Sequence, residues 1–81
     1  METAVRSVAE LGDVVRKARK AALLRQVDAA RMIGVSPPVL NKLEQGREVW
    51  LSKTFEICNA LGIEVILRTR DADSPAKTPA R

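Results

Sequence analysis

The chain has 81 residues, of which 30% are charged, and its 14 Lys and Arg against 10 Asp and Glu give a net charge of +4. One cysteine and no histidine exclude an internal disulfide and a histidine-containing metal site, although a domain this small buries only about 60% of its unfolded surface. No apolar run approaches the roughly 20 residues of a membrane helix and no signal-peptide core is present, so we expect one cytoplasmic domain, stabilised by self-association, without membrane contact or cofactor.

The first predicted helix begins at residue 7, after an arm of residues 1–6. Ser7 and Glu10 have the spacing of a capping box, in which side chains satisfy backbone N–H groups at the helix N-terminus. Apolar residues then recur at steps of three and four, which predicts one buried helical stripe. Its members are Leu11, Val14, Val15, Ala18 and Ala22.

Two short helical segments follow within residues 25–46. A three-residue break starts at Gly34, and Ser36 and Pro37 are placed as the N-cap and first residue of the second segment. Gly46 ends that segment. Two helices joined by a short, glycine-containing turn are typical of a helix-turn-helix. The expected apolar positions are Ala29, Ala30, Ile33, Val35, Leu40 and Leu43.

A last helix is predicted from the spacing of Leu51, Phe55, Cys58 and Leu61, and it ends at Gly62. Within this pattern, Cys58 is interpreted as a buried small hydrophobic residue rather than a reactive thiol.

The segment 63–69 is rich in β-branched residues and predicts a strand. Ile63, Val65 and Leu67 alternate on the face expected to cover the helical core. The alternative is a fifth helix or a frayed end after residue 62. Residues 70–81 have no apolar face to bury, so we expect a disordered tail.

Positive charge is concentrated in the middle of the chain. Residues 14–53 contain nine Lys and Arg against three Asp and Glu, a local charge of +6. A basic, compact domain favours a polyanionic partner, with DNA or RNA ahead of a membrane surface. The alternative is a solvated, charged surface without a partner.

The residues of the two short helices resemble a known family. Gln26, Ala30, Gly34, Val35, Leu40, Leu43, Glu44 and Gly46 match the pattern "Q…A…GV…I/L..LE.G" of the Xre-type, or lambda-repressor-like, helix-turn-helix domain. The match covers about residues 10–61 and implies a mainly α fold of four to five short helices. The ending "LGIEVILR" is similar to that of HipB-type antitoxins, in which this strand pairs with its copy across a homodimer. Independently of the family, a lone strand has unpaired backbone groups that a second copy can satisfy. Residues 7–69 would form the domain, with 63–69 as its dimerisation strand.

The resemblance also implies which residues contact DNA. The family's base-contacting positions correspond to Ser36, Pro37, Pro38, Asn41 and Lys42. Because proline side chains cannot hydrogen-bond to bases, direct readout is expected from Asn41 and Lys42, with low specificity in each half-site. Gln26 matches a phosphate-contacting glutamine, and the further phosphate candidates are Arg25, Arg47 and Lys53.

Two further interpretations concern structure. Arg19 and Glu44 match positions that form an ion pair in relatives, which would fix the second helix of the motif to the first helix of the domain. Trp50, the only tryptophan, is interpreted as packing against the last helix or near the dimer interface. A contact with a partner protein is the alternative for Trp50.

The resemblance predicts a homodimeric repressor that binds a palindromic operator and acts as the antitoxin of a HipA-like serine/threonine kinase toxin. Two alternatives remain: a free-standing, phage-like Xre regulator, and a protein-interaction module that has lost DNA binding. An enzyme is not expected, because the sequence lacks histidine, tyrosine, clustered carboxylates and an accessible nucleophile.

Overall fold

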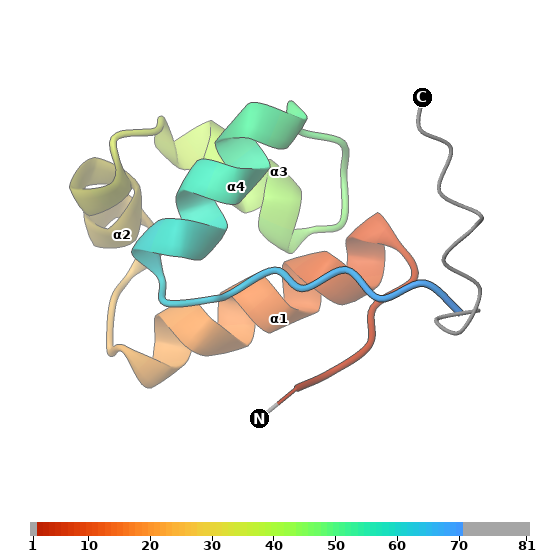
Figure 1. Ribbon diagram of the computed structural model, residues 1–81. Helices are drawn as coiled ribbons and strands as arrows, with labels where there is room; N and C mark the ends of the chain where they lie inside the picture. The colour runs from red at the N-terminus through yellow and green to blue at the C-terminus, as the bar shows by residue number, and fades with distance from the viewer. Residues whose placement is uncertain (1, 71–81) are drawn as a thin grey trace.

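The computed structural model describes residues 2–70 and contains four helices in that part of the chain. These are α1 (Val8–Ala21), α2 (Gln26–Ile33), α3 (Pro37–Glu44) and α4 (Leu51–Ala60). In Figure 1, α3 lies behind α4, while the extended segment 63–69 crosses in front of α1. The expected mainly α fold is confirmed, and the predicted tail lies almost wholly outside the described residues.

The N-terminus of α1 forms largely as predicted. The Ser7 hydroxyl accepts a hydrogen bond of 3.1 Å from the backbone N–H of Glu10. The Glu10 carboxylate accepts in return from the N–H of Arg6, one residue earlier than a standard capping box would place it. The predicted stripe ends early, because Ala22 lies beyond the helix and is exposed.

The turn between α2 and α3 consists of the three predicted residues. Gly34 has a φ of 96°, a left-handed conformation that residues with a side chain rarely adopt. Ser36 caps α3 by accepting from the N–H of Val39 at 3.4 Å, and Pro37 occupies the first position of the helix.

The core lies where the four helices meet. Its fully buried members are Val15, Ala29, Ala30, Leu40, Leu43, Ile57 and Cys58. The burial predicted for Cys58 is therefore confirmed, and it raises the pKa of the thiol. α1 and α3 approach so closely that a Cβ atom on Gly12 would lie 2.1 Å from the carbonyl oxygen of Leu43. Gly12, which the sequence interpretation overlooked, permits this crossing.

The buried face of α4 differs from the predicted one. Leu51 and Phe55 are exposed, whereas Thr54, Ile57 and Cys58 are buried. The face is thus rotated relative to the stripe expected from hydrophobic spacing. The outward side of α4 is left with large apolar side chains.

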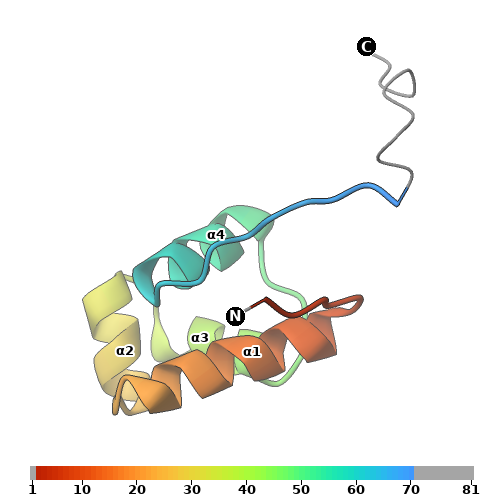
Figure 2. The same ribbon diagram turned by 60° about the horizontal axis from the view of Figure 1, so that its bottom comes forward.

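The segment 63–69 is extended but forms no strand with any other described part of the chain. Ile63 packs on the core, whereas Val65 is 43% exposed and Leu67 is 91% exposed. The expectation that all three residues cover the core of one copy is therefore wrong for Leu67. Figure 2 shows the end of this segment extending beyond the helices. A fifth helix is likewise not found in residues 63–70.

None of the helices in the described chain has the length and apolar character needed to cross a membrane.

Candidate nucleic-acid interface

A hydrogen-bonded network connects α1, α2 and α3. Arg19 of α1 donates from Nε to Glu44 Oε2 at 2.6 Å and from Nη2 to Glu44 Oε1 at 2.9 Å. Gln26 Nε2 also donates to Glu44 Oε1 at 2.9 Å, and Asn41 Nδ2 donates to Gln26 Oε1 at 3.2 Å. Arg19 Nη1 reaches the carbonyl oxygen of Leu24 at 2.7 Å. These bonds fix both helices of the helix-turn-helix motif to α1.

The charges at the centre of this network are shielded from water. The Arg19 and Glu44 side chains are only 9% and 3% exposed. Burial alone would raise the pKa of Glu44, but hydrogen bonds from Arg19 and Gln26, together with the positive charge of Arg19, hold the pKa below its usual value. The hydrogen bond to Glu44 raises the pKa of Arg19. Both groups are therefore charged at neutral pH.

The predicted base-contacting residues lie along α3 but differ in their surroundings. Ser36, Pro37 and Pro38 are exposed around the first turn of the helix. Asn41 is half-buried and lines a hollow with Gln26, whereas Lys42 is exposed and lines a different hollow beside α4. Thus the consecutive residues Asn41 and Lys42 line two different hollows.

The predicted phosphate contacts are more scattered. Gln26 belongs to the buried network, and Arg25 pairs with Asp28 at 2.8 Å on the surface. Arg47 is exposed in the loop after α3, while Lys53 lies within 3.5 Å of Glu56 on α4. Surface ion pairs of this kind contribute little to stability, so these cations can exchange partners readily.

Three residues beside the network were overlooked by the sequence interpretation. Arg16 and Lys20 of α1 and Gln45 at the end of α3 line the same hollow as Gln26 and Asn41. Arg16 and Lys20 are four residues apart and so share one face of α1. That spacing could have identified them as basic neighbours of Arg19, which lies three residues after Arg16.

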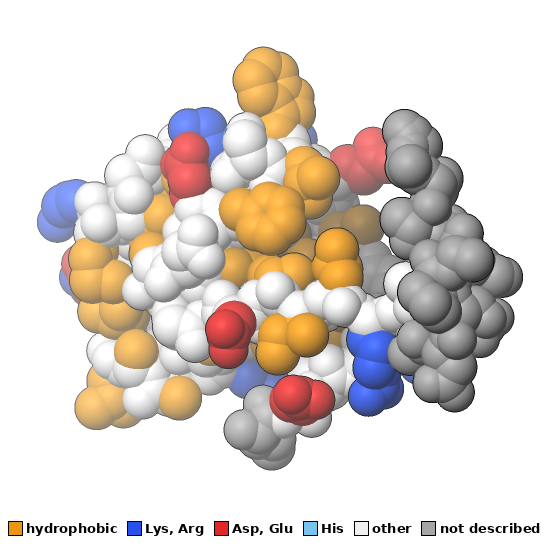
Figure 3. All heavy atoms as spheres, viewed as in Figure 1, with side chains coloured by type: hydrophobic (Ala, Val, Ile, Leu, Met, Phe, Trp, Pro, Cys, Tyr) orange, Lys and Arg blue, Asp and Glu red, His pale blue; other side chains and the backbone are white. Residues whose placement is uncertain are grey.

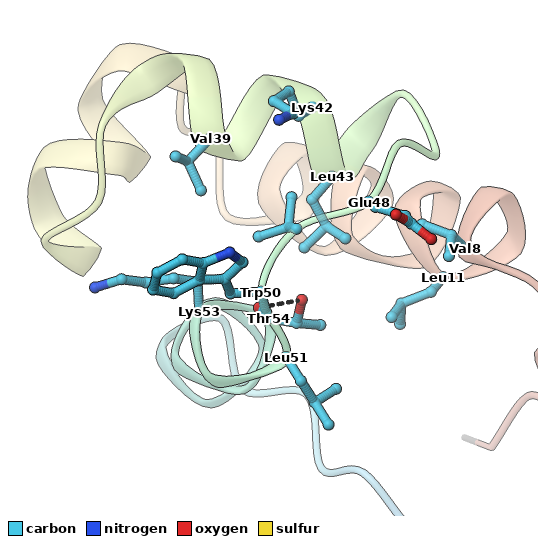
Figure 4. A pocket seen from close by; sticks show the side chains of 11 residues that line it. Val8, Leu11, Val39, Lys42, Leu43, Glu48, Trp50, Leu51, Lys53 and Thr54 are labelled. Carbon is cyan, nitrogen blue, oxygen red and sulfur yellow. Dashed lines mark hydrogen bonds between the residues drawn. The ribbon is translucent and has the colours of Figure 1, made fainter.

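Trp50 stands between α3 and the start of α4. Figure 4 shows it at a hollow that Val39 and Leu43 of α3 also line, with the Trp50 carbonyl accepting a hydrogen bond from Thr54 Oγ1. The Trp50 side chain is not packed against α4, because the residue is 80% exposed. The predicted packing against the last helix is therefore wrong, whereas packing near a dimer interface stays a prediction.

An apolar surface covers the side of the molecule that carries α4 and the extended segment. Figure 3 shows hydrophobic side chains gathered in the middle of this face, with both acidic and basic side chains around them. The large apolar residues exposed on these two elements include Leu51 and Phe55 of α4 and Val65 and Ile66 of the extended segment. We call these four residues the apolar face. In Figure 1, α3 lies behind this face.

In the described part of the chain, no three His, Cys, Asp or Glu side chains are grouped so as to hold a metal ion.

Comparisons with known proteins agree with this architecture. A helix-turn-helix family model matches residues 15–66. A solved structure of a HipB variant in complex with an O2 20mer superposes with a TM-score of 0.77 at 18% identity, covering 88% of this chain and 100% of that one. A HipA–HipB–O2–O3 complex contains a chain with a TM-score of 0.76 at 18% identity, covering 86% of this chain and 100% of that one. The comparison with curated proteins found no match. At this level of identity the solved structures show a shared fold, whereas the family match spans most of the sequence: the chain belongs to the helix-turn-helix family.

Proposed function

We propose that this protein is a sequence-specific DNA-binding repressor that places α3 in the major groove. The observation that carries the proposal is the exposed N-terminal turn of α3, on a helix whose other end is held to α1 by the Arg19–Glu44 pair. Arg16 and Lys20 line a hollow with Asn41 of the same helix. In helix-turn-helix proteins, the second helix of the motif meets base edges with its N-terminal residues. Basic residues beside it attract the phosphate backbone.

Direct base readout is assigned to Asn41 and Lys42, since both can hydrogen-bond to base edges. Ser36 can contribute a hydroxyl, while Pro37 and Pro38 offer only apolar contact, for example to a thymine methyl group. The proposed phosphate contacts are Arg25, Gln26, Arg47 and Lys53. With few hydrogen-bonding groups on α3, part of the specificity is expected to come from DNA deformability.

We further propose that the protein acts as a homodimer through residues 63–69. Within the described chain, no backbone hydrogen bond joins residues 64–69 to another segment. Pairing with the same segment of a second copy would satisfy one edge of each strand. The same association would cover Val65 and Ile66, which are 43% and 60% exposed. A two-fold axis would then present two α3 helices to half-sites about 34 Å apart in a palindromic operator.

The proposed biological role is that of an antitoxin which binds a HipA-type kinase toxin and represses its own operon. The support is the shared fold with HipB in the two solved complexes, one of which also contains HipA. A free-standing Xre-type regulator is the alternative, and it would have the same DNA-binding surface without a kinase partner.

The test is fluorescence anisotropy with duplex DNA from the region upstream of the gene, measured over a series of salt concentrations. We expect log affinity to fall steeply with log salt, as several phosphate contacts require. Asn41→Ala and Lys42→Ala should weaken specific binding more than binding to unrelated DNA. No binding to upstream DNA would favour the protein-interaction module, with Pro37 and Pro38 as the cause of the lost DNA binding.

Co-expression with a neighbouring kinase-like gene product distinguishes an antitoxin, which co-purifies with the kinase, from a free-standing regulator.

A further inference from the structure

We infer that Glu44 is a positioning residue for base readout, because its charge determines which atom of Asn41 is available to DNA. This inference rests on the proposed function, since it concerns how α3 reads a base. It extends the role of Glu44 beyond the ion pair with Arg19. The link is the Gln26 side chain, which bonds to both Glu44 and Asn41.

Donors and acceptors determine how each amide of the network is oriented. An ionised carboxylate can only accept hydrogen bonds, so the Gln26 atom that faces Glu44 must be the NH₂ group. The carbonyl oxygen of Gln26 must then face Asn41. Because that oxygen only accepts, Asn41 has to turn its own NH₂ group toward Gln26. The observed bonds of 2.9 Å and 3.2 Å follow this order.

The charge of Glu44 is itself fixed by its surroundings. Two hydrogen bonds from Arg19 reach the two carboxylate oxygens, and the Glu44 side chain is only 3% exposed. Arginine remains protonated and offers only donors. Arg19, Glu44, Gln26 and Asn41 therefore form one ordered series of donors and acceptors, which begins on α1 and ends at the reading surface of α3.

The consequence concerns the base opposite Asn41. One N–H of the Asn41 NH₂ group is committed to Gln26. The carbonyl oxygen of Asn41 is turned away from Gln26 and can accept a hydrogen bond from a base. In the major groove, adenine N6 and cytosine N4 are the donors, whereas guanine O6 and thymine O4 are acceptors. The structure thus favours adenine or cytosine at the position that Asn41 reads.

The decisive variant is Glu44→Gln, which keeps the shape of the side chain and removes its charge. Arg19 Nε makes the shorter bond, 2.6 Å to Glu44 Oε2, so the carbonyl of the new amide should take that position. Its NH₂ group would then replace Oε1, which accepts from both Gln26 and Arg19 Nη2. Gln26 and then Asn41 would have to rotate their amides in response. The NH₂ group of Asn41 would become the group available to the base, and the preferred base would change to guanine or thymine.

The experiment is a binding selection from a randomised duplex library with the full-length protein. Asn41→Ala identifies the position that Asn41 reads, by removing the preference there. For the wild type we expect at least about a fivefold preference for adenine or cytosine at that position, and for Glu44→Gln a reversed preference. The matched control is Ile57→Val, which lowers stability in the buried core without touching the network. It should leave the preference unchanged.

A purely structural role for Glu44 would give a different result. Glu44→Gln would then weaken binding to all sequences equally and keep the wild-type preference, which would overturn the inference.

NMR of the side-chain amides in the free protein provides a readout that does not require DNA. We expect Glu44→Gln to shift the resonances of both Gln26 and Asn41. A shift confined to Gln26 would also overturn the inference. A wild-type protein that binds no DNA but shows the coupled shift would refute the proposed function and leave the ordered network intact.

Discussion

The two sides of this small protein differ in how many of their polar groups have hydrogen-bond partners and in how much of their apolar surface is buried. Around α3, the buried charges of Arg19 and Glu44 have partners, and in the described residues no buried side-chain nitrogen or oxygen lacks a hydrogen bond. On the opposite side, the apolar face is open and the backbone of residues 64–69 has no intrachain ladder. The polar groups on the α3 side find their partners within one copy. The opposite side would gain hydrogen bonds and buried apolar area from a second chain.

This difference separates the two tasks of the proposed repressor. A surface that reads DNA must hold its side chains in place before binding, because ordering them during binding costs affinity. A dimerising surface can leave apolar groups exposed until the second copy covers them. The extended segment therefore contributes little to the helical core of one copy, apart from Ile63.

The largest effect is expected from Glu44→Ala, which tests whether the α3 side depends on its buried pair. The variant would leave the Arg19 guanidinium, on a side chain only 9% exposed, without its carboxylate partner. We expect a loss of about 3 kcal/mol in the free energy of unfolding, measured with urea. The control is Asp13→Ala, which breaks an exposed pair with Lys17 and should cost less than about 1 kcal/mol. Similar losses in both variants would show that the buried Arg19–Glu44 pair stabilises the fold no more than an exposed ion pair does.

The next effect tests the apolar side. Leu67→Asp places a charge in the segment proposed to pair between copies, where burying a leucine contributes about 1.5–3 kcal/mol. We expect the dimer dissociation constant, measured by sedimentation equilibrium, to rise at least about tenfold. Leu23→Asp is the matched control, because Leu23 and Leu67 are both 91% exposed but Leu23 lies in the turn after α1. Equal weakening by both variants would contradict dimerisation through residues 63–69.

A smaller effect is expected where α1 and α3 cross. Gly12→Ala should gain about 1 kcal/mol of helix propensity, but its Cβ would meet the Leu43 carbonyl oxygen at 2.1 Å and force the helices apart. We expect a net loss of about 1–2 kcal/mol in thermal or urea unfolding. Gly62→Ala serves as the comparison, because a Cβ atom there would meet no atom within 4 Å and only the φ of 76° is unfavourable. A Gly12→Ala variant as stable as the wild type would show that the crossing can relax.

The sequence predicted local features of the fold well. Ser7, Gly34 and Ser36 act through the backbone within a few residues, so their roles can be inferred without knowing the tertiary structure. The position of Gly12 could not be inferred in this way, because its significance comes from Leu43, 31 residues later. Similarly, the rotation of α4 depends on the volume left by the other helices, which hydrophobic spacing does not describe.

The candidate site shows the same limit. A pairing of Arg19 with Glu44 was expected from family resemblance, and the structure contains it. The participation of Gln26 and Asn41 was not expected, because each was interpreted as a separate contact with DNA. Amide side chains can bond to protein or to DNA equally well, and only the geometry of α2 against α3 shows that these two bond to each other.

The smallest effect concerns the dependence of stability on pH. The pKa of Glu44 in the folded protein lies below its ordinary value of 4.5. Between these two pKa values the unfolded chain binds more protons than the folded one, so stability falls as the pH drops through that window. The loss is about 1.4 kcal/mol for each pH unit that separates the two values.

Urea unfolding at a series of acidic pH values should show this slope, and Glu44→Gln should reduce it. Asp28→Asn should change it little, although Arg25 also lowers the pKa of Asp28, because that pair is on the surface and water screens it. If Asp28→Asn removed the slope and Glu44→Gln did not, the surface pair of Asp28 and Arg25 would cause the loss of stability in acid. The buried charge of Glu44 would then contribute no measurable pH dependence.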